Sequence, residues 1–122
     1  MKRAKKSPRR KLVSEADRVF SLWIRKRDNK QYGHCVFCKK PIEHCFHFIT
    51  RAKYSVRWDE LNCTSSCRSC NYSMEYNPHP FIKWFLDKHG LATYEALILK
   101  SNQIAKFSTE DLQGIIEKYN EK

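Results

Sequence analysis

Two pairs of cysteines, each with two residues between the partners, constrain this chain more than any other feature. The pairs are Cys35/Cys38 and Cys67/Cys70, and 28 residues lie between them. Cysteines at this spacing are typical of tetrahedral zinc sites, because a short turn brings both thiolates to one ion. Four thiolates leave no open coordination position. We therefore predict a structural zinc that ties two distant segments together.

The segment between the pairs carries residues that indicate a chemistry. His47 lies near the end of residues 42–49, which are rich in aromatic and β-branched residues and which we expect to form a strand. Asn62 lies five residues before the second cysteine pair, and Asn71 directly follows it. This order of Cys-x-x-Cys, His, Asn and Cys-x-x-Cys-Asn is the pattern of the zinc-containing HNH (ββα-metal) nucleases, here in an H-N-N form.

These residue types fit metal-dependent hydrolysis of a phosphodiester bond. A neutral imidazole near pH 7 can take a proton from water, which makes His47 the candidate general base. Asn62 would orient His47 or its loop through hydrogen bonds. Asn71 would offer its amide oxygen to a catalytic Mg2+ or Mn2+. Glu75, four residues further along a predicted helix, is a candidate second ligand on the same face.

One position departs from many HNH enzymes, which carry Asp or His as a metal ligand directly before the base. That position is Phe46 here, and Asp59, Glu75, water or the substrate phosphate remain open as replacements. The same motif also has a non-catalytic interpretation, in which the histidine belongs to the core and the asparagines serve a turn and a helix cap. Cys45 and Cys63 are expected as small buried side chains, although Cys45 reaches the site if residues 45 and 47 share a strand face.

Charge is unevenly distributed along the chain, whose formal net charge is +11. Residues 1–57 hold 17 Lys or Arg against four acidic residues, whereas residues 58–122 hold seven against nine. Such a field attracts a polyanion, so we expect DNA as a partner, with a merely solvated basic tail as the alternative. The basic residues expected to contact DNA from the N-terminal region are Lys2, Arg3, Lys5, Lys6, Arg9, Arg10, Lys11, Arg18 and Arg25.

Length and composition predict one α+β domain, because 122 residues with 41% hydrophobic content can bury one modest core. We expect a flexible basic arm over 1–13, and a zinc-containing domain over 14–122 that consists of a helix (14–30), a zinc/HNH core (31–77) and a helical part (78–122). No stretch approaches the roughly 20 apolar residues that cross a bilayer. The charged start lacks the apolar run of a secretory signal, so we expect a cytoplasmic protein without a membrane partner.

Local signals predict where the elements begin and end. Ser14 resembles an N-cap for the first helix, and a second strand is expected around residues 55–58. The second cysteine pair should lead into a short helix over about residues 67–76. The C-terminal third predicts three helices, of which the first ends at Gly90 and the last begins after Ser108.

Taken together, these residues resemble the NinG family of bacteriophage recombination proteins, also called Rap. The resemblance extends over about residues 11–120. It rests on Ala16-Asp17-Arg18-Val19-Phe20-Ser21, Ile24-Arg25-x-Arg27-Asp28, Cys35-x-x-Cys38, Cys45-x-His47-Phe48-Ile49-x-Arg51, Arg57-x-Asp59-Glu60-x-Asn62, Cys67-x-x-Cys70-Asn71 and Asn77. Phe46 departs from the family pattern, in which a small residue such as Gly is expected, and this bears on access to His47.

The resemblance implies a phage-encoded endonuclease that cuts branched recombination intermediates, including Holliday junctions and D-loops, in the host cytoplasm. Symmetric cleavage of a junction would need two active sites, which motivates a homodimer, and other recombination proteins are candidate partners. Arg51 and Arg57 are expected to bind phosphate, with pairing to Asp59 or Glu60 as the alternative. Two other functions remain open: a non-catalytic zinc-dependent DNA-binding module, and an HNH endonuclease that cuts duplex DNA.

Overall fold

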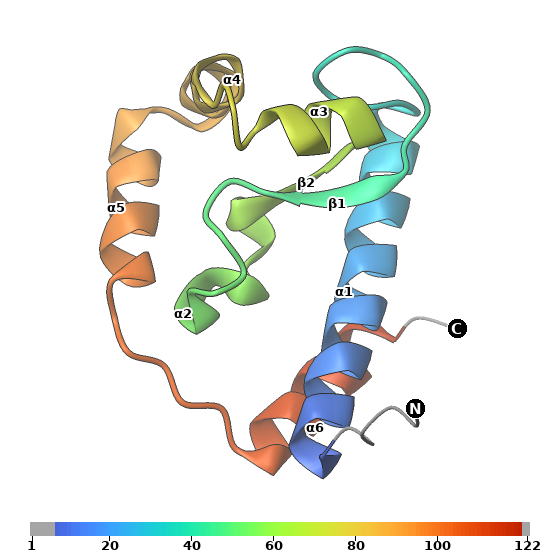
Figure 1. Ribbon diagram of the computed structural model, residues 1–122, viewed down its shortest axis with the longest axis vertical. Coiled ribbons are helices and arrows are strands. Elements are labelled where there is room, and N and C mark those ends of the chain that lie inside the picture. The colour runs from blue at the N-terminus through green and yellow to red at the C-terminus, as the bar shows by residue number, and fades with distance from the viewer. Residues whose placement is uncertain (1–6, 121–122) are drawn as a thin grey trace, which may run out of the picture.

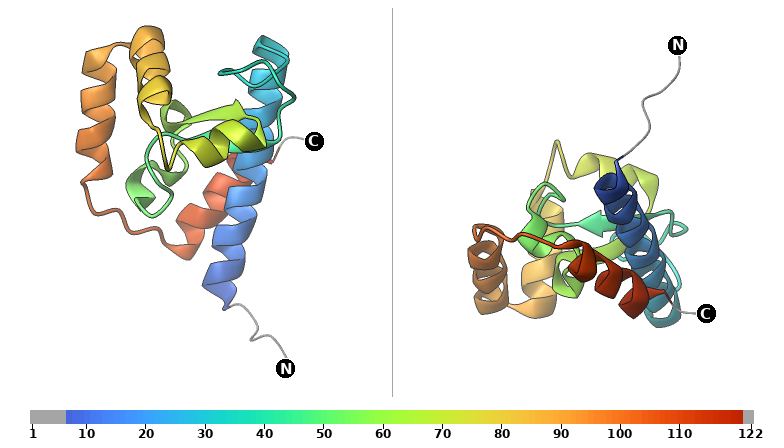
Figure 2. Two further views of the ribbon diagram at one scale, coloured as in Figure 1. Left: turned by 45° about the horizontal axis from the view of Figure 1, so that its top comes forward. Right: turned by 90° about the horizontal axis from the view of Figure 1, so that it is seen from below.

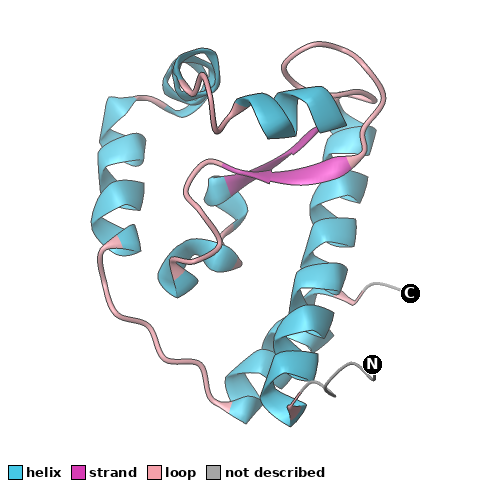
Figure 3. Cartoon of the chain, in the orientation of Figure 1, coloured by secondary structure: helices cyan, strands magenta, loops and turns pink. Residues whose placement is uncertain are grey.

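The computed structural model describes residues 7–120 and combines helices with one small antiparallel sheet (Figures 1 and 3). This mixture confirms the expected α+β class. In chain order the elements are α1 (Pro8–Gln31), β1 (His44–His47), α2 (Tyr54–Arg57), the 3-10 helix η1 (Glu60–Asn62), β2 (Cys63–Ser66), α3 (Arg68–Ser73), α4 (His79–His89), α5 (Leu91–Ser101) and α6 (Thr109–Tyr119). No helix within residues 7–120 has both the length and the apolar character that crossing a bilayer requires.

Helix α1 begins at Pro8, so the predicted start at Ser14 is wrong. The side chain of Ser7 caps the helix by accepting a hydrogen bond from the Arg10 amide at 3.2 Å, and proline suits the first turn because its missing N–H has no partner there. Buried Val13 holds this early segment against the rest of the molecule. Residues 8–13, expected in the flexible arm, are therefore helical. Lys2, Arg3, Lys5 and Lys6 lie outside the described residues.

The first hydrophobic core joins the two ends of the chain. Helix α6 lies alongside the N-terminal half of α1, as the views in Figures 1 and 2 show, and Phe20 meets Tyr119 edge to face at 4.8 Å between ring centroids. Ser108 and Asp111 form a capping box at the start of α6. Gly90 ends α4 with φ 89°, a left-handed conformation that favours glycine. Both boundaries were predicted.

The sheet pairs β1 with β2 in antiparallel register, with His47 opposite Cys63. The second strand was expected at residues 55–58, but those residues form most of α2, and the strand lies at 63–66. Every residue of β2 is buried although three are polar. Each hydroxyl has a hydrogen-bond acceptor. Thr64 donates to Asp28 Oδ2 at 3.2 Å, Ser65 to the Ile24 carbonyl at 3.3 Å and Ser66 to the Cys67 carbonyl at 3.1 Å. An apolar pattern could not reveal such a strand.

The two faces of the sheet contribute to different cores. Phe46 and Phe48 belong to a second core with residues of α4 and α5, whereas Cys63 packs with α1 in the first core and Cys45 lies against that core. Phe46 is completely buried, and its ring lies 4.9 Å from that of Phe37 between centroids. Alternation along β1 thus places residues 45 and 47 on the opposite face from residue 46.

Candidate functional site

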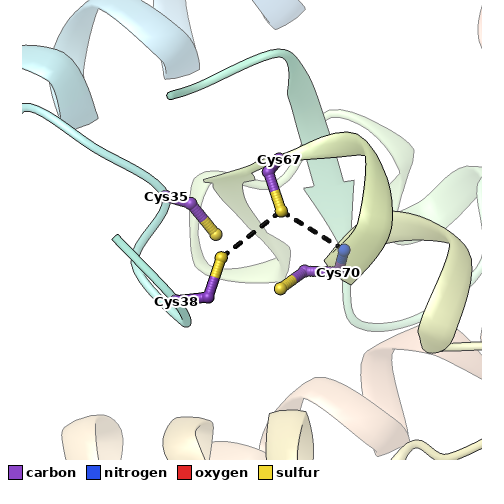
Figure 4. A group of neighbouring side chains, drawn as sticks. All are labelled: Cys35, Cys38, Cys67 and Cys70. Atoms are coloured by element: carbon purple, nitrogen blue, oxygen red, sulfur yellow. Dashed lines mark hydrogen bonds between the residues drawn. The ribbon is translucent and has the colours of Figure 1, made fainter. Parts of the chain in front are cut away.

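The four cysteines of the two predicted pairs converge between the loop after α1 and the start of α3 (Figure 4). Their sulfur atoms all lie within 4.8 Å of one another, and Cys38 Sγ is 3.4 Å from Cys67 Sγ. A tetrahedron with Zn–S bonds of about 2.3 Å separates its sulfurs by about 3.8 Å. Sulfur donors at this spacing fit a zinc ion, so the cluster could bind zinc as predicted.

Local hydrogen bonds shape both halves of the cluster. The Cys35 amide donates to the Lys40 carbonyl at 2.7 Å, and Lys39 takes a left-handed φ of 69°, which closes a tight turn. Cys67 is the N-cap of α3, and its sulfur accepts from the Cys70 amide at 3.4 Å. Burial raises the pKa of Cys67, but hydrogen bonds from that amide and from neighbouring thiols outweigh it and give a pKa of about 7. A thiolate is therefore accessible near neutral pH.

A cavity of about 660 Å3 opens between α1, β1 and α3. This volume is within the range of small-molecule sites. Its lining includes five residues that the sequence predicts as catalytic, metal-binding or DNA-contacting residues. They are His47, Asn71, Glu75, Arg51 and Arg25. The lining also includes Asp17, Glu43 and Cys45, so carboxylates, guanidinium groups and a thiol all border the space.

His47 lies at the end of β1 with one ring nitrogen engaged. Its Nε2 is 3.0 Å from the carbonyl oxygen of Arg57. A carbonyl can only accept, so Nε2 carries the proton and the lone pair of the neutral ring is on Nδ1. Burial lowers the pKa of His47 below its usual 6.5, against the opposing effect of this hydrogen bond. The imidazole is therefore neutral and basic at pH 7.

Asn62 does not line the cavity but holds the loop that supports His47. It is completely buried at the end of η1. Its Oδ1 accepts from the Ile49 amide at 2.8 Å, and its Nδ2 donates to the carbonyls of Ile49 and Val56 at 2.9 and 3.0 Å. The same loop carries the Arg57 carbonyl that contacts His47, so Asn62 holds the segment on which the histidine rests.

Arg57 uses its guanidinium inside the protein. It donates to both carboxylate oxygens of Asp17, at 3.0 and 2.6 Å, and its guanidinium carbon lies 4.8 Å from the centre of the Tyr54 ring. The alternative to phosphate binding was an ion pair with Asp59 or Glu60, but Arg57 pairs with Asp17 instead. Trp58 Nε1 donates to the same carboxylate at 3.1 Å. Arg51 remains 60% exposed, with Nη1 3.7 Å from Asp17 Oδ2.

Other predicted residues lie away from the cavity. Asp59 accepts from Lys100 Nζ at 2.6 Å and from the Leu61 amide at 2.9 Å, so the structure does not bring this candidate metal ligand to His47. Arg18 is exposed and pairs with Glu15. The first turn of α1 contains the basic residues Arg9, Arg10 and Lys11. Arg9 Nη1 donates to the Phe107 carbonyl at 2.6 Å. Phe46 is on the far face of the sheet, and therefore does not obstruct the histidine.

The family model described as "Bacteriophage Lambda NinG protein" matches residues 1–122, the whole chain. This chain belongs to the NinG family. No curated protein and no solved structure matches it. Membership in NinG indicates a function related to phage recombination.

Arg27 and Asp28 attach α1 of this NinG protein to the sheet. Asp28 is 1% exposed, and Arg27 Nε donates to it at 2.9 Å. Arg27 Nη2 also donates to the Cys63 carbonyl at 3.0 Å. The buried acid is therefore paired and hydrogen-bonded, as buried charges must be. Sequence reasoning missed this link, because nothing local shows that Arg27 reaches a residue 36 positions away.

Sequence reasoning also missed a second group of metal-ligating atoms in this NinG protein. Cys45, His47 and Cys63 each offer one ligand atom, and the three atoms lie within 4.8 Å of one another. Strand alternation does place residues 45 and 47 on one face. The third member could not be identified, because the strand that contains Cys63 was assigned to other residues.

Proposed function

We propose that this protein is a metal-dependent endonuclease that cuts branched DNA recombination intermediates such as Holliday junctions and D-loops. The observation that carries the proposal is the arrangement of His47. Its imidazole is fixed by the Arg57 carbonyl, is neutral at pH 7, and lines one cavity with Asn71 and Glu75. A fixed neutral base beside oxygen donors is what phosphodiester hydrolysis requires.

The order of elements supports an HNH, or ββα-metal, core. Strand β1 ends with His47, β2 pairs with it in antiparallel register, and α3 follows directly with Asn71. Asn62 stabilises the loop between the strands through three hydrogen bonds. The positions of His47 and Asn71 at one cavity, with Asn62 in the neighbouring loop, support the H-N-N interpretation.

In the proposed reaction, Nδ1 of His47 takes a proton from water as the water oxygen attacks phosphorus. The bond from phosphorus to the leaving oxygen breaks, and that oxygen takes a proton from solvent. Arg51, which is exposed at the cavity, binds the phosphate. Arg57 is not assigned this role, because Asp17 already neutralises it.

Asn71 and Glu75 are the residues that would hold Mg2+ or Mn2+. Both offer hard oxygen atoms, which these cations prefer, and both line the cavity. Mg2+ commonly keeps several waters and takes few protein ligands together with substrate phosphate, so a ligand at position 46 is not required. When bound, the cation would stabilise negative charge on the phosphate and the leaving oxygen.

NinG membership and the basic first half of the chain support the choice of recombination DNA as the substrate. Two symmetric cuts in a junction need two active sites, so we propose that two copies act together. The experiment compares a labelled four-way junction with a linear duplex of matched sequence, in Mg2+, Mn2+ or EDTA. His47→Ala is tested beside His79→Ala, which changes an exposed histidine outside the cavity.

Metal-dependent cutting of the junction that is lost in His47→Ala, retained in His79→Ala and weak on the duplex would support the proposal. Equal cutting by His47→Ala and the wild type would contradict the mechanism. Tight binding without cutting in either metal would favour the zinc-dependent binding module. Equal cutting of both substrates would favour an endonuclease for duplex DNA.

A further inference from the structure

We infer that Cys45, His47 and Cys63 form a second metal site, separate from the four-cysteine cluster, that takes a thiophilic cation such as Zn2+. One ligand atom of each residue lies within 4.8 Å of the other two. None of the three belongs to the four-cysteine cluster. The site is therefore a separate donor set and not an extension of the structural one.

The register of the sheet builds this donor set. His47 is paired directly with Cys63 across the antiparallel strands. Cys45 precedes His47 by two residues and therefore lies on the same face of β1. Side chains that are directly or diagonally opposite on one face are close enough to interact, so a single ion can contact all three. The rigid sheet holds the donors together without a loop rearrangement.

The donors favour a soft metal over the hard cation proposed for catalysis. Two thiolates and an imidazole are typical zinc ligands, and in a tetrahedral site they lie about 3.5 to 3.8 Å apart. The separations within 4.8 Å thus need only small side-chain rotations. Cys45 and His47 line the cavity, which leaves a fourth coordination position open toward it.

The charge balance also favours a divalent cation. On binding, each thiol loses its proton to solvent, and two thiolates with Zn2+ are together neutral. Cys63 is only 3% exposed, so a neutral assembly avoids leaving a net charge in its buried surroundings. The imidazole contributes the Nδ1 lone pair, because Nε2 is already bonded to the Arg57 carbonyl.

Occupation of this site has a consequence that rests on the proposed function. The lone pair that coordinates Zn2+ is the one that would take the proton of the attacking water. The protein then has two mutually exclusive states, with His47 free as a base or bound to metal. Excess Zn2+ would inhibit DNA cutting, although the same ion at the four-cysteine cluster stabilises the fold.

Zinc titration followed by native mass spectrometry, in a reducing buffer, tests the site without reference to nuclease activity. We expect two zinc equivalents per wild-type chain, with the second removed first by a chelator because it has fewer thiolates. Cys45→Ser and His47→Gln should each bind one equivalent. Ser21→Ala, which changes a residue of the same cavity that is not a ligand, should still bind two. Circular dichroism checks that each variant is folded.

A single equivalent in the folded wild type, or a second equivalent that persists in Cys45→Ser, would overturn the inference. A disulfide between Cys45 and Cys63 in the reducing buffer would overturn it as well. If the chain cuts DNA, excess Zn2+ in Mg2+ buffer should stop the wild type and should affect Cys45→Ser much less. If no chain cuts, the proposed function fails while the zinc stoichiometry still decides whether the site exists.

Discussion

The hydrogen bond from His47 Nε2 to the Arg57 carbonyl fixes the tautomer of the imidazole. Burial lowers the pKa of this ring, so it loses its proton below the usual 6.5. A general base acts in its deprotonated form, and cutting should therefore rise with pH through this pKa and level off by about pH 6.5. Below the pKa the rate should fall about tenfold per pH unit.

Rates on a four-way junction between about pH 5 and 8, at constant metal and ionic strength, measure this dependence. An acid limb with its midpoint above 7 would contradict the assignment of a depressed His47 pKa. The free energy of unfolding should change with pH in the same direction as the cutting rate. Because the folded-state pKa is below the unfolded one, the contribution of His47 is present above 6.5 and is lost as pH falls through the folded pKa.

Asn62 is a residue whose removal should affect stability more than its small size suggests. Asn62→Ala deletes three hydrogen bonds at a completely buried position and leaves the Ile49 amide without its partner. We expect the free energy of unfolding to fall by about 2 to 4 kcal/mol. Urea denaturation measures the loss, and Asn29→Ala at an exposed position of α1 is the control. Similar denaturation midpoints for the two variants would refute this stabilising role of Asn62.

At the scale of single residues, motif spacing predicted which side chains lie close together within the cysteine cluster and the cavity. The cysteine pairs and the His47–Asn71 combination follow from short motifs, and the structure brings them together. Pairings between distant positions were not predictable. Asp17 lies only three residues after the predicted cap Ser14, yet its carboxylate binds Arg57, 40 positions away. Local patterns carry no information about such a partner.

At the scale of elements, the strongest helical patterns were predicted and the polar strand was not. Helices α4 and α6 show apolar periodicity with recognisable caps, and the structure confirms them. The hydroxyl groups of buried β2 donate to residues of α1 and to the Cys67 carbonyl just before α3, and the sequence of the strand has no apolar alternation. The start of α1 was misplaced because a basic segment looks like a solvated arm until Ser7 and Pro8 are recognised as its cap.

The first turn of α1 contains basic residues and no acidic one, which is unfavourable beside the positive end of a helix dipole. Phosphates would relieve this repulsion. If both side chains contact DNA, the double variant Arg10→Gln/Lys11→Gln should reduce the magnitude of the slope of log K against log salt by about 2 on duplex or junction DNA. Fluorescence anisotropy at several salt concentrations measures the slope. Lys83→Gln, which changes an exposed side chain of α4, is the control, and a slope unchanged in the double variant would exclude contact by this turn.

At the scale of the whole molecule, the four-cysteine cluster adds a link between two distant segments beside two hydrophobic cores. One core joins α1 to α6, the other joins β1 to α4 and α5, and the cysteines link the loop after α1 to the start of α3. A small domain with two modest cores gains much of its cohesion from such a link. The sequence predicted the link, but the division of the core across two faces of the sheet depends on strand register.

Removal of the zinc should therefore destabilise the whole fold and not only the loop that carries Cys35. Cys38 is exposed, so Cys38→Ser removes a ligand while disturbing the packing little. Because the metal-binding free energy contributes directly to folding, we expect a loss of several kcal/mol, seen as a lower melting temperature that added Zn2+ does not restore. Ser21→Ala, which changes a residue of neither cysteine-containing group, should retain the wild-type transition. A wild-type protein that melts at the same temperature with and without a strong chelator, after metal analysis has shown the zinc to be gone, would mean that the cores hold together unaided and that the cluster serves another purpose.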